Sequence, residues 1–229
     1  MDSWSLDLKS EFVNNLYESY LNRVEHITTL YSVVTLIEQQ ICSSSECLNE
    51  AVEIPLSTNF GNWATIKRKR DIMHSVKSGQ LHRINCYQAV VSLVSNFEDL
   101  IDRIINHVRV SKKEISNAAP IGQKGRIDHP LLKKVHAVHS NLSMHSNMVG
   151  RHETYYYYRI IKARNCIVHR QGIPNSLETT LLQGWVSDGC IAFDKNQIDD
   201  FVHFFLMPLI SMIKQLDQQL GEDIEESNS

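Results

Sequence analysis

The sequence predicts an all-α protein, a helical bundle with one small β-hairpin before its last helix. Long stretches repeat apolar residues at spacings of three and four, which is the period of an amphipathic helix. Segments rich in Gly, Pro, Ser or Asn separate these stretches. The chain has 229 residues, of which 42% are hydrophobic and 21% charged, so it is long enough to bury a sizeable core.

The first 80 residues predict a helical extension packed on that core. A long helix ends near residues 42–47, "CSSSEC", and residues 53–62, "EIPLSTNFGN", are expected to form a loop. A weaker helix is expected over residues 63–76. The apolar stripe of the long helix consists of Phe12, Leu16, Tyr20, Val24, Ile27, Tyr31, Val34, Ile37 and Ile41.

Residues 81–220 are expected to form the core itself. A helix from about Leu81 to Val110 is followed by a loop at residues 116–130. Pro130 suits the first position of the next helix, which continues toward Gly150. The stripe of the helix that begins at Leu81 consists of Ile84, Tyr87, Val91, Val94, Phe97, Ile101, Ile104 and Val108.

The end of the core predicts a helix, a hairpin and a last helix. Gly172 suits the position that ends a helix over residues 153–170. Asp188-Gly189 suits a two-residue type I′ turn between short strands. Asp194 and Gln197 predict a capping box at the start of the last helix, and residues 221–229 predict a disordered acidic tail.

Charge is segregated along the chain. Residues 103–170 contain 13 Lys or Arg against three acids, a net of +10, and residues 171–229 carry two lysines and ten acids, a net of −8. The basic span favours an anionic partner. Alternatively, it packs against the acidic span within the fold or across a dimer, and charge alone leaves both interpretations open.

The sequence predicts a cytoplasmic protein with no membrane contact. Its first residues, "MDSWSLDLKSE", show neither a basic nor an apolar region of a secretory signal. The most apolar stretch, residues 201–213, is too short to span a bilayer. Five cysteines without a CxxC pair predict free thiols in a reducing compartment.

Two charged residues lie on predicted apolar faces. Glu98 follows Val94 by four residues, and Arg164 shares a stripe with Tyr157, Ile161 and Val168. An unpaired buried charge costs several kcal/mol, so we expect Glu98, or its neighbour Asp99, to pair with Arg164 across two packed helices. The alternative is that both reach solvent at the edge of the stripe.

Asn165 and His169 are four residues apart and share a helix face, which can line a cleft while Arg164 points toward a neighbouring helix. His169 lies in the last turn, where the helix dipole favours an imidazolium that suits a general acid or a phosphate contact. On spacing alone, a histidine that merely caps the helix carbonyls is the favoured interpretation.

The segment "ARNCIVHRQGIPN", residues 163–175, resembles the motif helix of HEPN domains, a family of small α-helical nucleotide-binding and ribonuclease domains. Arg164, Asn165 and His169 match the family motif, and "VSNFEDLIDRII", residues 94–105, is similar to its earlier acidic helix, at Glu98 or Asp99. The resemblance covers about residues 81–220.

This resemblance implies a metal-independent endoribonuclease without a cofactor, acting as a homodimer whose two motifs face one cleft. It implies His169 as general acid or base, Arg164 as the phosphate-stabilising cation and Asn165 as the residue that orients one of them. It further implies a toxin or antiviral effector with a possible antitoxin or defence partner. Some relatives keep the fold as a non-cleaving nucleotide-, RNA- or partner-binding module, which is the second hypothesis.

Weaker RNA contacts are expected from basic residues around the motif: Lys133, Lys134, Arg159, Lys162 and Arg170. An exposed tyrosine of Tyr155–Tyr158 would suit base stacking. A third hypothesis, a metal-binding protein, rests on His136, His139 and His145, but no Cys or Asp completes a familiar ligand set. We therefore expect surface histidines and no metal.

Overall fold

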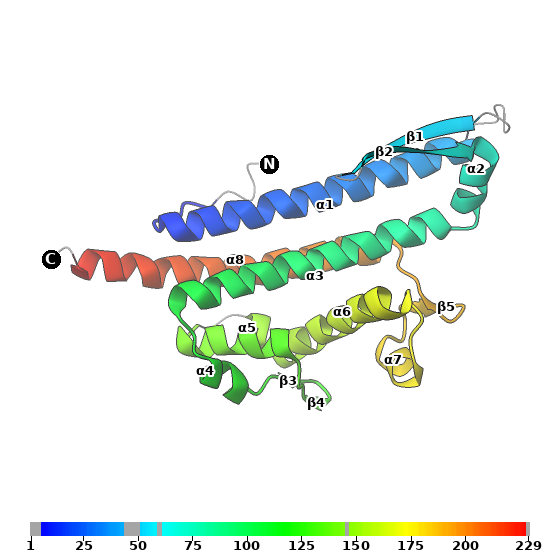
Figure 1. Cartoon of the computed structure of the whole chain (residues 1–229). Helices are drawn as coiled ribbons and strands as arrows, with labels where there is room; N and C mark the ends of the chain where they lie inside the picture. Colours follow the sequence, from blue (N-terminus) through cyan, green and yellow to red (C-terminus); the bar gives the residue numbers. More distant parts are fainter. Residues whose placement is uncertain (1–5, 44–50, 59–60, 145–146, 228–229) are drawn as a thin grey trace.

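Three long helices lie side by side in the computed structural model, and two shorter ones cover them on one side (Figure 1). The long helices are α1 (Glu11–Ser43), α3 (Gln80–Val108) and α8 (Lys195–Ser227), and the covering helices are α5 (Pro130–Asn141) and α6 (Arg151–Arg170). The structure describes residues 6–43, 51–58, 61–144 and 147–227. The predicted all-α fold class is confirmed.

Short elements connect these helices. They are β1 (Ala51–Thr58), β2 (Gly61–Arg68), α2 (Lys69–Lys77), α4 (Lys112–Asn117), β3 (Ile121–Gly122), β4 (Gly125–Arg126), the 3₁₀ turn η2 (Asn147–Val149), α7 (Ser176–Leu181), β5 (Val186–Ser187) and β6 (Cys190–Ile191). None of the described helices combines the length and the apolar character that crossing a bilayer requires.

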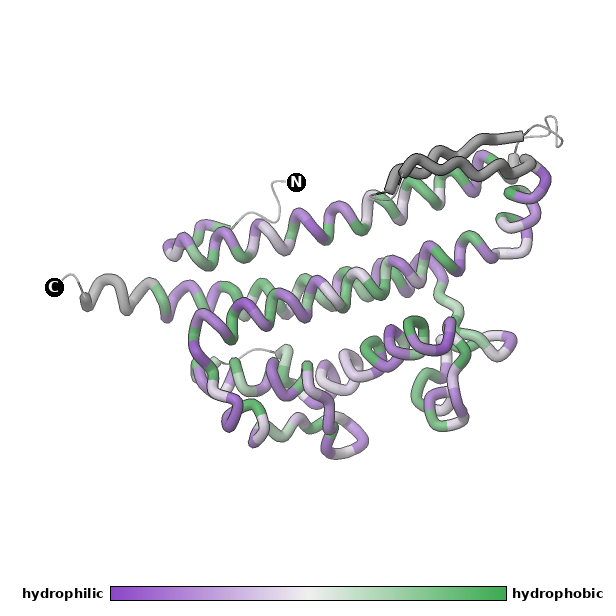
Figure 2. Tube along the Cα trace, in the orientation of Figure 1, coloured by the Kyte–Doolittle hydropathy of each residue, from purple (hydrophilic) through white to green (hydrophobic). Residues whose placement is uncertain are grey.

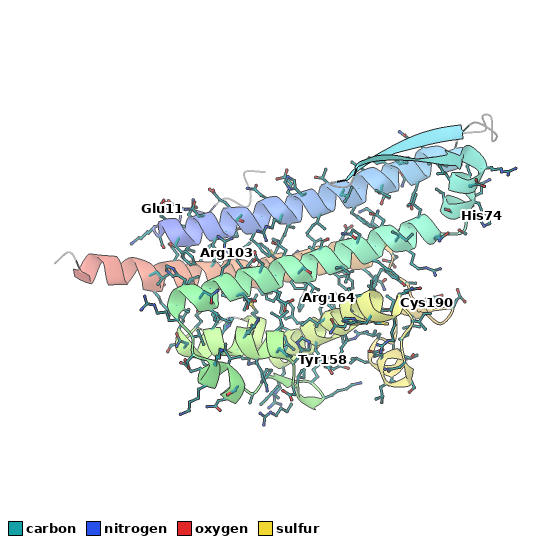
Figure 3. The ribbon with its side chains drawn as sticks, in the orientation of Figure 1. Glu11, His74, Arg103, Tyr158, Arg164 and Cys190 are labelled. Atoms are coloured by element: carbon teal, nitrogen blue, oxygen red, sulfur yellow. The ribbon has the colours of Figure 1, made fainter. Side chains whose placement is uncertain are left out.

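The apolar sides of the long helices meet in one core, visible as the green inward-facing turns in Figure 2. Figure 3 shows their side chains filling the space between α1, α3 and α6. Helix α3 is central, since α1, α5, α6 and α8 all pack against it. The rings of Phe97 on α3 and Tyr157 on α6 stack with centroids 5.5 Å apart, which fixes α6 against α3 through large buried aromatic surfaces.

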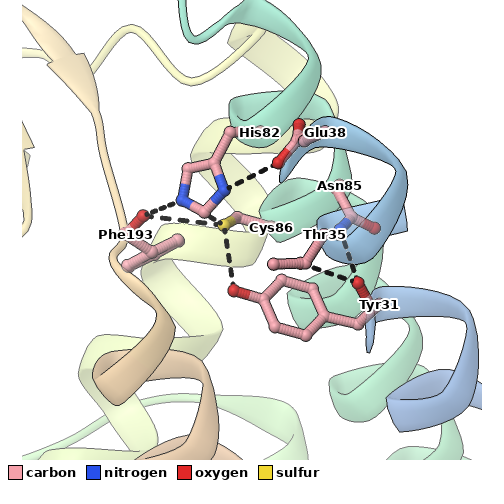
Figure 4. Close-up of polar contacts among 7 residues, drawn as sticks. All are labelled: Tyr31, Thr35, Glu38, His82, Asn85, Cys86 and Phe193. Carbon is pink, nitrogen blue, oxygen red and sulfur yellow. Dashed lines mark hydrogen bonds and ion pairs between the residues drawn. The ribbon is translucent and has the colours of Figure 1, made fainter. Parts of the chain in front are cut away.

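The N-terminal extension is fastened to the core by polar contacts as well as apolar ones (Figure 4). His82 of α3 lies 3.6 Å from the carboxylate of Glu38 on α1, and its Nε2 lies 3.2 Å from the carbonyl oxygen of Phe193, just before α8. The thiol of Cys86 lies 3.5 Å from that same oxygen, and burial raises its pKa to about 11. This network joins α1, α3 and the start of α8, and burial within it keeps the Cys86 thiol protonated at neutral pH.

Several local predictions are confirmed. Gly172 has a left-handed φ of 81° directly after α6 and Gln171. Asp188 and Gly189, with φ of 52° and 74°, form the turn between β5 and β6. Asp194 and Gln197 exchange the two hydrogen bonds of a capping box at the start of α8.

The region before α2 was predicted wrongly. In the described residues, the loop expected at residues 53–62 is instead an antiparallel hairpin, β1 with β2. The weak helix expected at residues 63–76 is confirmed from residue 69 onward as α2, whereas residues 63–68 belong to β2. Helical spacing and strand alternation are hard to separate in so short a stretch, and β-branched residues at 52, 54, 58, 65 and 66 favour strands. At the other end of the chain, α8 continues to Ser227, through most of the segment predicted as a disordered tail.

Three residues of the predicted apolar stripes are exposed rather than buried. Ile37 is 45% exposed, Ile84 is 55% exposed and Val168 is 50% exposed. Each lies within two turns of a helix end, at the end of α1, the start of α3 and the end of α6. Periodicity predicts which face is apolar, but it does not predict where the neighbouring helix stops.

Candidate active site

Arg164 lies on the side of α6 that faces α3 (Figure 3). Its Nη2 is 3.7 Å from a carboxylate oxygen of Glu98, and its Nη1 donates a 3.0 Å hydrogen bond to Oδ1 of Asn165. Only 25% of the Arg164 side chain is exposed. The Nε of Arg164 is buried and has no hydrogen-bond partner among the described residues.

The expected contact between an acid of α3 and Arg164 is therefore present, and Glu98 makes it. Asp99, the other candidate, instead forms a 2.6 Å ion pair with Arg23 of α1. Neighbouring residues on a helix point about 100° apart, so the two acids serve different partners. One acid holds the motif arginine, and the next holds the extension helix.

The other two motif residues differ in exposure. Asn165 is half-buried, and its amide oxygen accepts a hydrogen bond from Arg164. His169 is exposed, and within the described part of the chain it forms no hydrogen bond or ion pair. The structure thus brings Arg164, Asn165 and Glu98 into contact and leaves the imidazole of His169 open to solvent one turn further along α6.

Four of the five cations predicted to contact RNA have partners within the chain. Lys133 and Lys134 each lie 2.6 Å from an acid, Asp128 and Asp102 respectively, and Arg170 pairs with Glu178 of α7. Arg159 donates to the backbone oxygens of residues 181 and 183 and lies 4.1 Å from the centre of the Trp185 ring. These side chains position the segments around α6.

Lys162 is the exception among the five. Its Nζ lies 5.4 Å above the ring of Tyr158, one turn earlier on α6, and no acidic partner occurs among the described residues. The ring of Tyr158 also meets the edge of His129, with centroids 6.4 Å apart. The three side chains form a partly exposed cluster at the start of α5 and the middle of α6.

His129 was not predicted as a site residue. Burial, and to a smaller extent the charges of Lys162 and Arg164, lower its pKa to about 4. Its Nδ1 is buried and unpartnered among the described residues. No sequence pattern indicated this position, because its partners lie about 30 residues away on another helix.

His136, His139 and His145 were expected to be surface histidines. For His136 and His139, which the structure describes, this prediction was wrong. His136 donates or accepts a 3.1 Å hydrogen bond at Thr154, and burial lowers its pKa to about 4. His139 is buried and lies 2.8 Å from the carbonyl oxygen of Val135, and burial lowers its pKa as well. His145 lies outside the described residues. The described residues contain no group of three His, Cys, Asp or Glu arranged for a metal ion.

A separate groove of about 650 Å³ lies between α1 and α8. Its walls are mainly apolar, with Tyr17, Leu21 and Leu206 among them, and Glu18 and Glu25 lie at its border. None of the predicted site residues lines it. Carboxylates at an apolar groove do not suit a polyanion, so this groove is not the candidate RNA site.

Comparisons of the chain with family models, with curated proteins and with solved structures returned no match. The function below is therefore argued from the geometry around α6 and from the motif resemblance.

Proposed function

We propose that this chain is a metal-independent endoribonuclease of HEPN type that acts as a homodimer on RNA. The observation that carries the proposal is the arrangement on α6. Arg164 lies against Glu98 and Asn165, and an exposed His169, whose imidazole has no partner among the described residues, lies in the last turn of the same helix.

RNA supplies its own nucleophile, the 2′-hydroxyl, so cleavage needs a proton-transfer group and a cation rather than a metal or cofactor. In the proposed scheme His169 transfers the proton, and Arg164 stabilises the negative charge that develops on the phosphorus oxygens. Asn165 restricts the guanidinium to one orientation, which keeps the cation in place before the substrate binds.

The dimer follows from the same resemblance. One chain offers a single Arg164–His169 pair, and the family motif acts in pairs across a cleft. Exposed apolar side chains near His169, namely Val168, Ile173 and Leu177, would be covered by a second copy. We further propose a toxin or antiviral defence role in the cytoplasm, with an antitoxin or defence protein as a possible partner.

A non-cleaving RNA- or partner-binding module is the second candidate function. It is favoured by the internal pairing of Lys133, Lys134 and Arg170, which leaves fewer cations for RNA. It is also favoured by the commitment of two Arg164 nitrogens to Glu98 and Asn165.

The decisive experiment compares the wild type with His169→Ala on total cellular RNA in the presence of EDTA. We expect wild-type cleavage that leaves 2′,3′-cyclic phosphate ends, because the 2′-hydroxyl is the nucleophile. The variant should lose ~10²–10⁴-fold in rate, as expected for removal of a general acid or base. Alanine is tolerated in a helix, and His169 is exposed, so the fold should be retained.

His203→Ala is the matched control, since His203 is also an exposed histidine on a helix, α8. It should cleave like the wild type, and circular dichroism should give the same helix content for all three proteins. Equal activity of the wild type and His169→Ala, or no wild-type cleavage of any RNA offered, would instead support the non-cleaving module.

A further inference from the structure

One face of α6 carries a row of partly exposed polar and aromatic residues. Tyr158, Lys162, Asn165 and His169 follow one another at spacings of four, three and four, so they share one side of the helix. The positions between them, such as Ile160, Ile161 and Ala163, are buried in the core. The row leads from the candidate catalytic residue His169 back toward the middle of α6.

At the Tyr158 end of this row, three side chains from two segments of the chain form a cluster. His129, which precedes the first residue of α5, meets Tyr158 edge-on at 6.4 Å, and Lys162 lies 5.4 Å above the same ring. A cation and two aromatic rings thus converge from two segments of the chain. Lys162 and His169 are seven residues apart, which is roughly 10 Å along a helix.

Two features of the cluster indicate a missing ligand. The Nδ1 of His129 is buried without a hydrogen-bond partner among the described residues, which costs free energy until a ligand or water supplies one. Lys162 has no acidic neighbour there to compensate its charge, whereas the nearby Lys133 and Lys134 are paired with acids. The cluster is therefore short of one anionic group and one hydrogen-bonding group.

We propose that His129, Tyr158 and Lys162 form a nucleotide subsite that binds single-stranded RNA beyond the two nucleotides that flank the bond cleaved at His169. The inference rests on the proposed ribonuclease function and adds a second point of substrate contact to it. Lys162 binds a backbone phosphate, and the rings of Tyr158 and His129 receive the base of the same nucleotide. Stacked bases on Tyr and His side chains are the usual mode of single-strand RNA recognition.

The state of His129 suits a base rather than a phosphate. Its lowered pKa of about 4 leaves the imidazole neutral at pH 7, with one nitrogen that donates and one that accepts. Asp128, the adjacent acid, forms an ion pair with Lys133, and its charge opposes the effect of the two cations on the pKa of His129 but is the smallest of these influences. On α6 the charges that face His129 are those of Lys162 and Arg164, and Arg164 is in turn compensated by Glu98 of α3.

Substrates of different length can distinguish the contribution of this subsite from that of the catalytic residues. A dinucleotide that occupies His169 is too short to reach a cluster roughly 10 Å away, whereas an oligonucleotide of eight residues reaches both. We expect wild-type kcat/KM to be higher on the octanucleotide than on the dinucleotide. His129→Ala and Lys162→Ala should remove most of this gain, each raising KM on the octanucleotide by roughly 10-fold with little change in kcat.

Both variants should cleave the dinucleotide like the wild type, since neither residue would contact it. The side chain of His129 makes no capping hydrogen bond to α5, so its removal should leave the helix content and the melting temperature unchanged. Lys214→Ala is the control for loss of one exposed lysine, on α8, and should behave like the wild type on both substrates.

Equal effects of His129→Ala on both substrates, or no effect on either, would overturn the subsite and leave the ribonuclease proposal intact. If the wild type cleaves neither substrate, the cleavage proposal fails and binding decides the subsite. The probe is then a fluorescent 2′-O-methyl octanucleotide, whose affinity should fall about 10-fold in each variant. Unchanged affinity, or competition by inorganic phosphate as effective as by the octanucleotide, would overturn it.

Discussion

The contact between Glu98 and Arg164 determines where the guanidinium of the motif lies. Glu98 is 40% exposed and Arg164 is 25% exposed, so water screens their attraction. The pair therefore contributes little to folding, about 0–1 kcal/mol. Its value is positional, because the carboxylate holds Nη2 on the α3 side while Nε stays without a partner among the described residues.

We therefore predict that Glu98→Gln affects cleavage more than stability. The free energy of unfolding in urea should fall by at most about 1 kcal/mol. The cleavage rate should fall by roughly 10- to 100-fold, because a misplaced catalytic group loses much of its effect. Asp99→Asn is the matched control, since Asp99 pairs with Arg23 instead. A control that lost as much activity as Glu98→Gln would contradict this assignment.

At the candidate site, the sequence could predict residues that lie on one helix or that are joined by one expected contact. Arg164, Asn165 and His169 were selected by the motif resemblance and stay a prediction, while the contact expected between Arg164 and either Glu98 or Asp99 is present at Glu98. His129 could not be predicted in this way. Its relation to Tyr158 and Lys162 arises only when the start of α5 packs beside α6.

The position of His169 depends on the turn that ends α6. Gly172 continues the left-handed turn that Gln171 begins, and the ring of Tyr87 from α3 packs directly against it. The hydroxyl of Tyr87 donates a 2.7 Å hydrogen bond to the carbonyl oxygen of Ile191 on β6. The turn after the motif is thus fixed by α3 and by the hairpin at once.

Gly172→Ala should therefore destabilise the protein more than an ordinary glycine substitution. A left-handed alanine costs about 1–2 kcal/mol. In addition, its Cβ would lie 2.0 Å from the Tyr87 hydroxyl and 2.5 Å from its Cζ, so the ring must move and release its hydrogen bond. Gly189→Ala is the matched control, because its φ of 74° is similar and nothing lies within 4 Å of the added carbon. Urea denaturation should show Gly172→Ala to be less stable than this control by about 1–3 kcal/mol; equal losses would contradict the packing argument.

Elements that contain a long periodic stretch of apolar residues, or a specific turn sequence, could be predicted. The helices α1, α3, α6 and α8 and the β5–β6 turn follow from apolar spacing, a capping box and an Asp-Gly pair. The β1–β2 hairpin was missed because a short stretch supports either period. The end of α8 was missed because acidic composition alone says little about a helix that is already established.

Over the whole molecule, some of the basic residues in the span 103–170 form ion pairs within the fold. The basic span reaches acids outside itself through Lys134 with Asp102, Arg164 with Glu98 and Arg170 with Glu178. Of these three pairs, Arg170 with Glu178 joins the basic span to the acidic span of residues 171–229, whereas the other two reach acids of α3. Fewer unpaired cations around α6 predict an RNA affinity that depends less steeply on salt than the formal charge alone would indicate.

The surface around His169 also bears on assembly. Leu177, at the start of α7, is 82% exposed, and Ile173 and Val168 are 55% and 50% exposed. All three lie within nine residues of the proposed catalytic histidine. Such apolar side chains on the surface are suited to a protein–protein contact, and a second copy placed there would bring two motif helices together.

We predict that the wild type is a dimer at micromolar concentration in light scattering and that Leu177→Glu is a monomer. A carboxylate buried at an interface without a partner costs several kcal/mol, which is enough to dissociate a modest dimer. Because two motifs are expected to form one cleft, the monomer should also lose cleavage while its circular dichroism spectrum stays unchanged. Leu30→Glu is the matched control, since Leu30 is 55% exposed on α1 and lies apart from the motif. It should remain dimeric and active, and a wild type that scatters as a monomer would contradict the paired cleft.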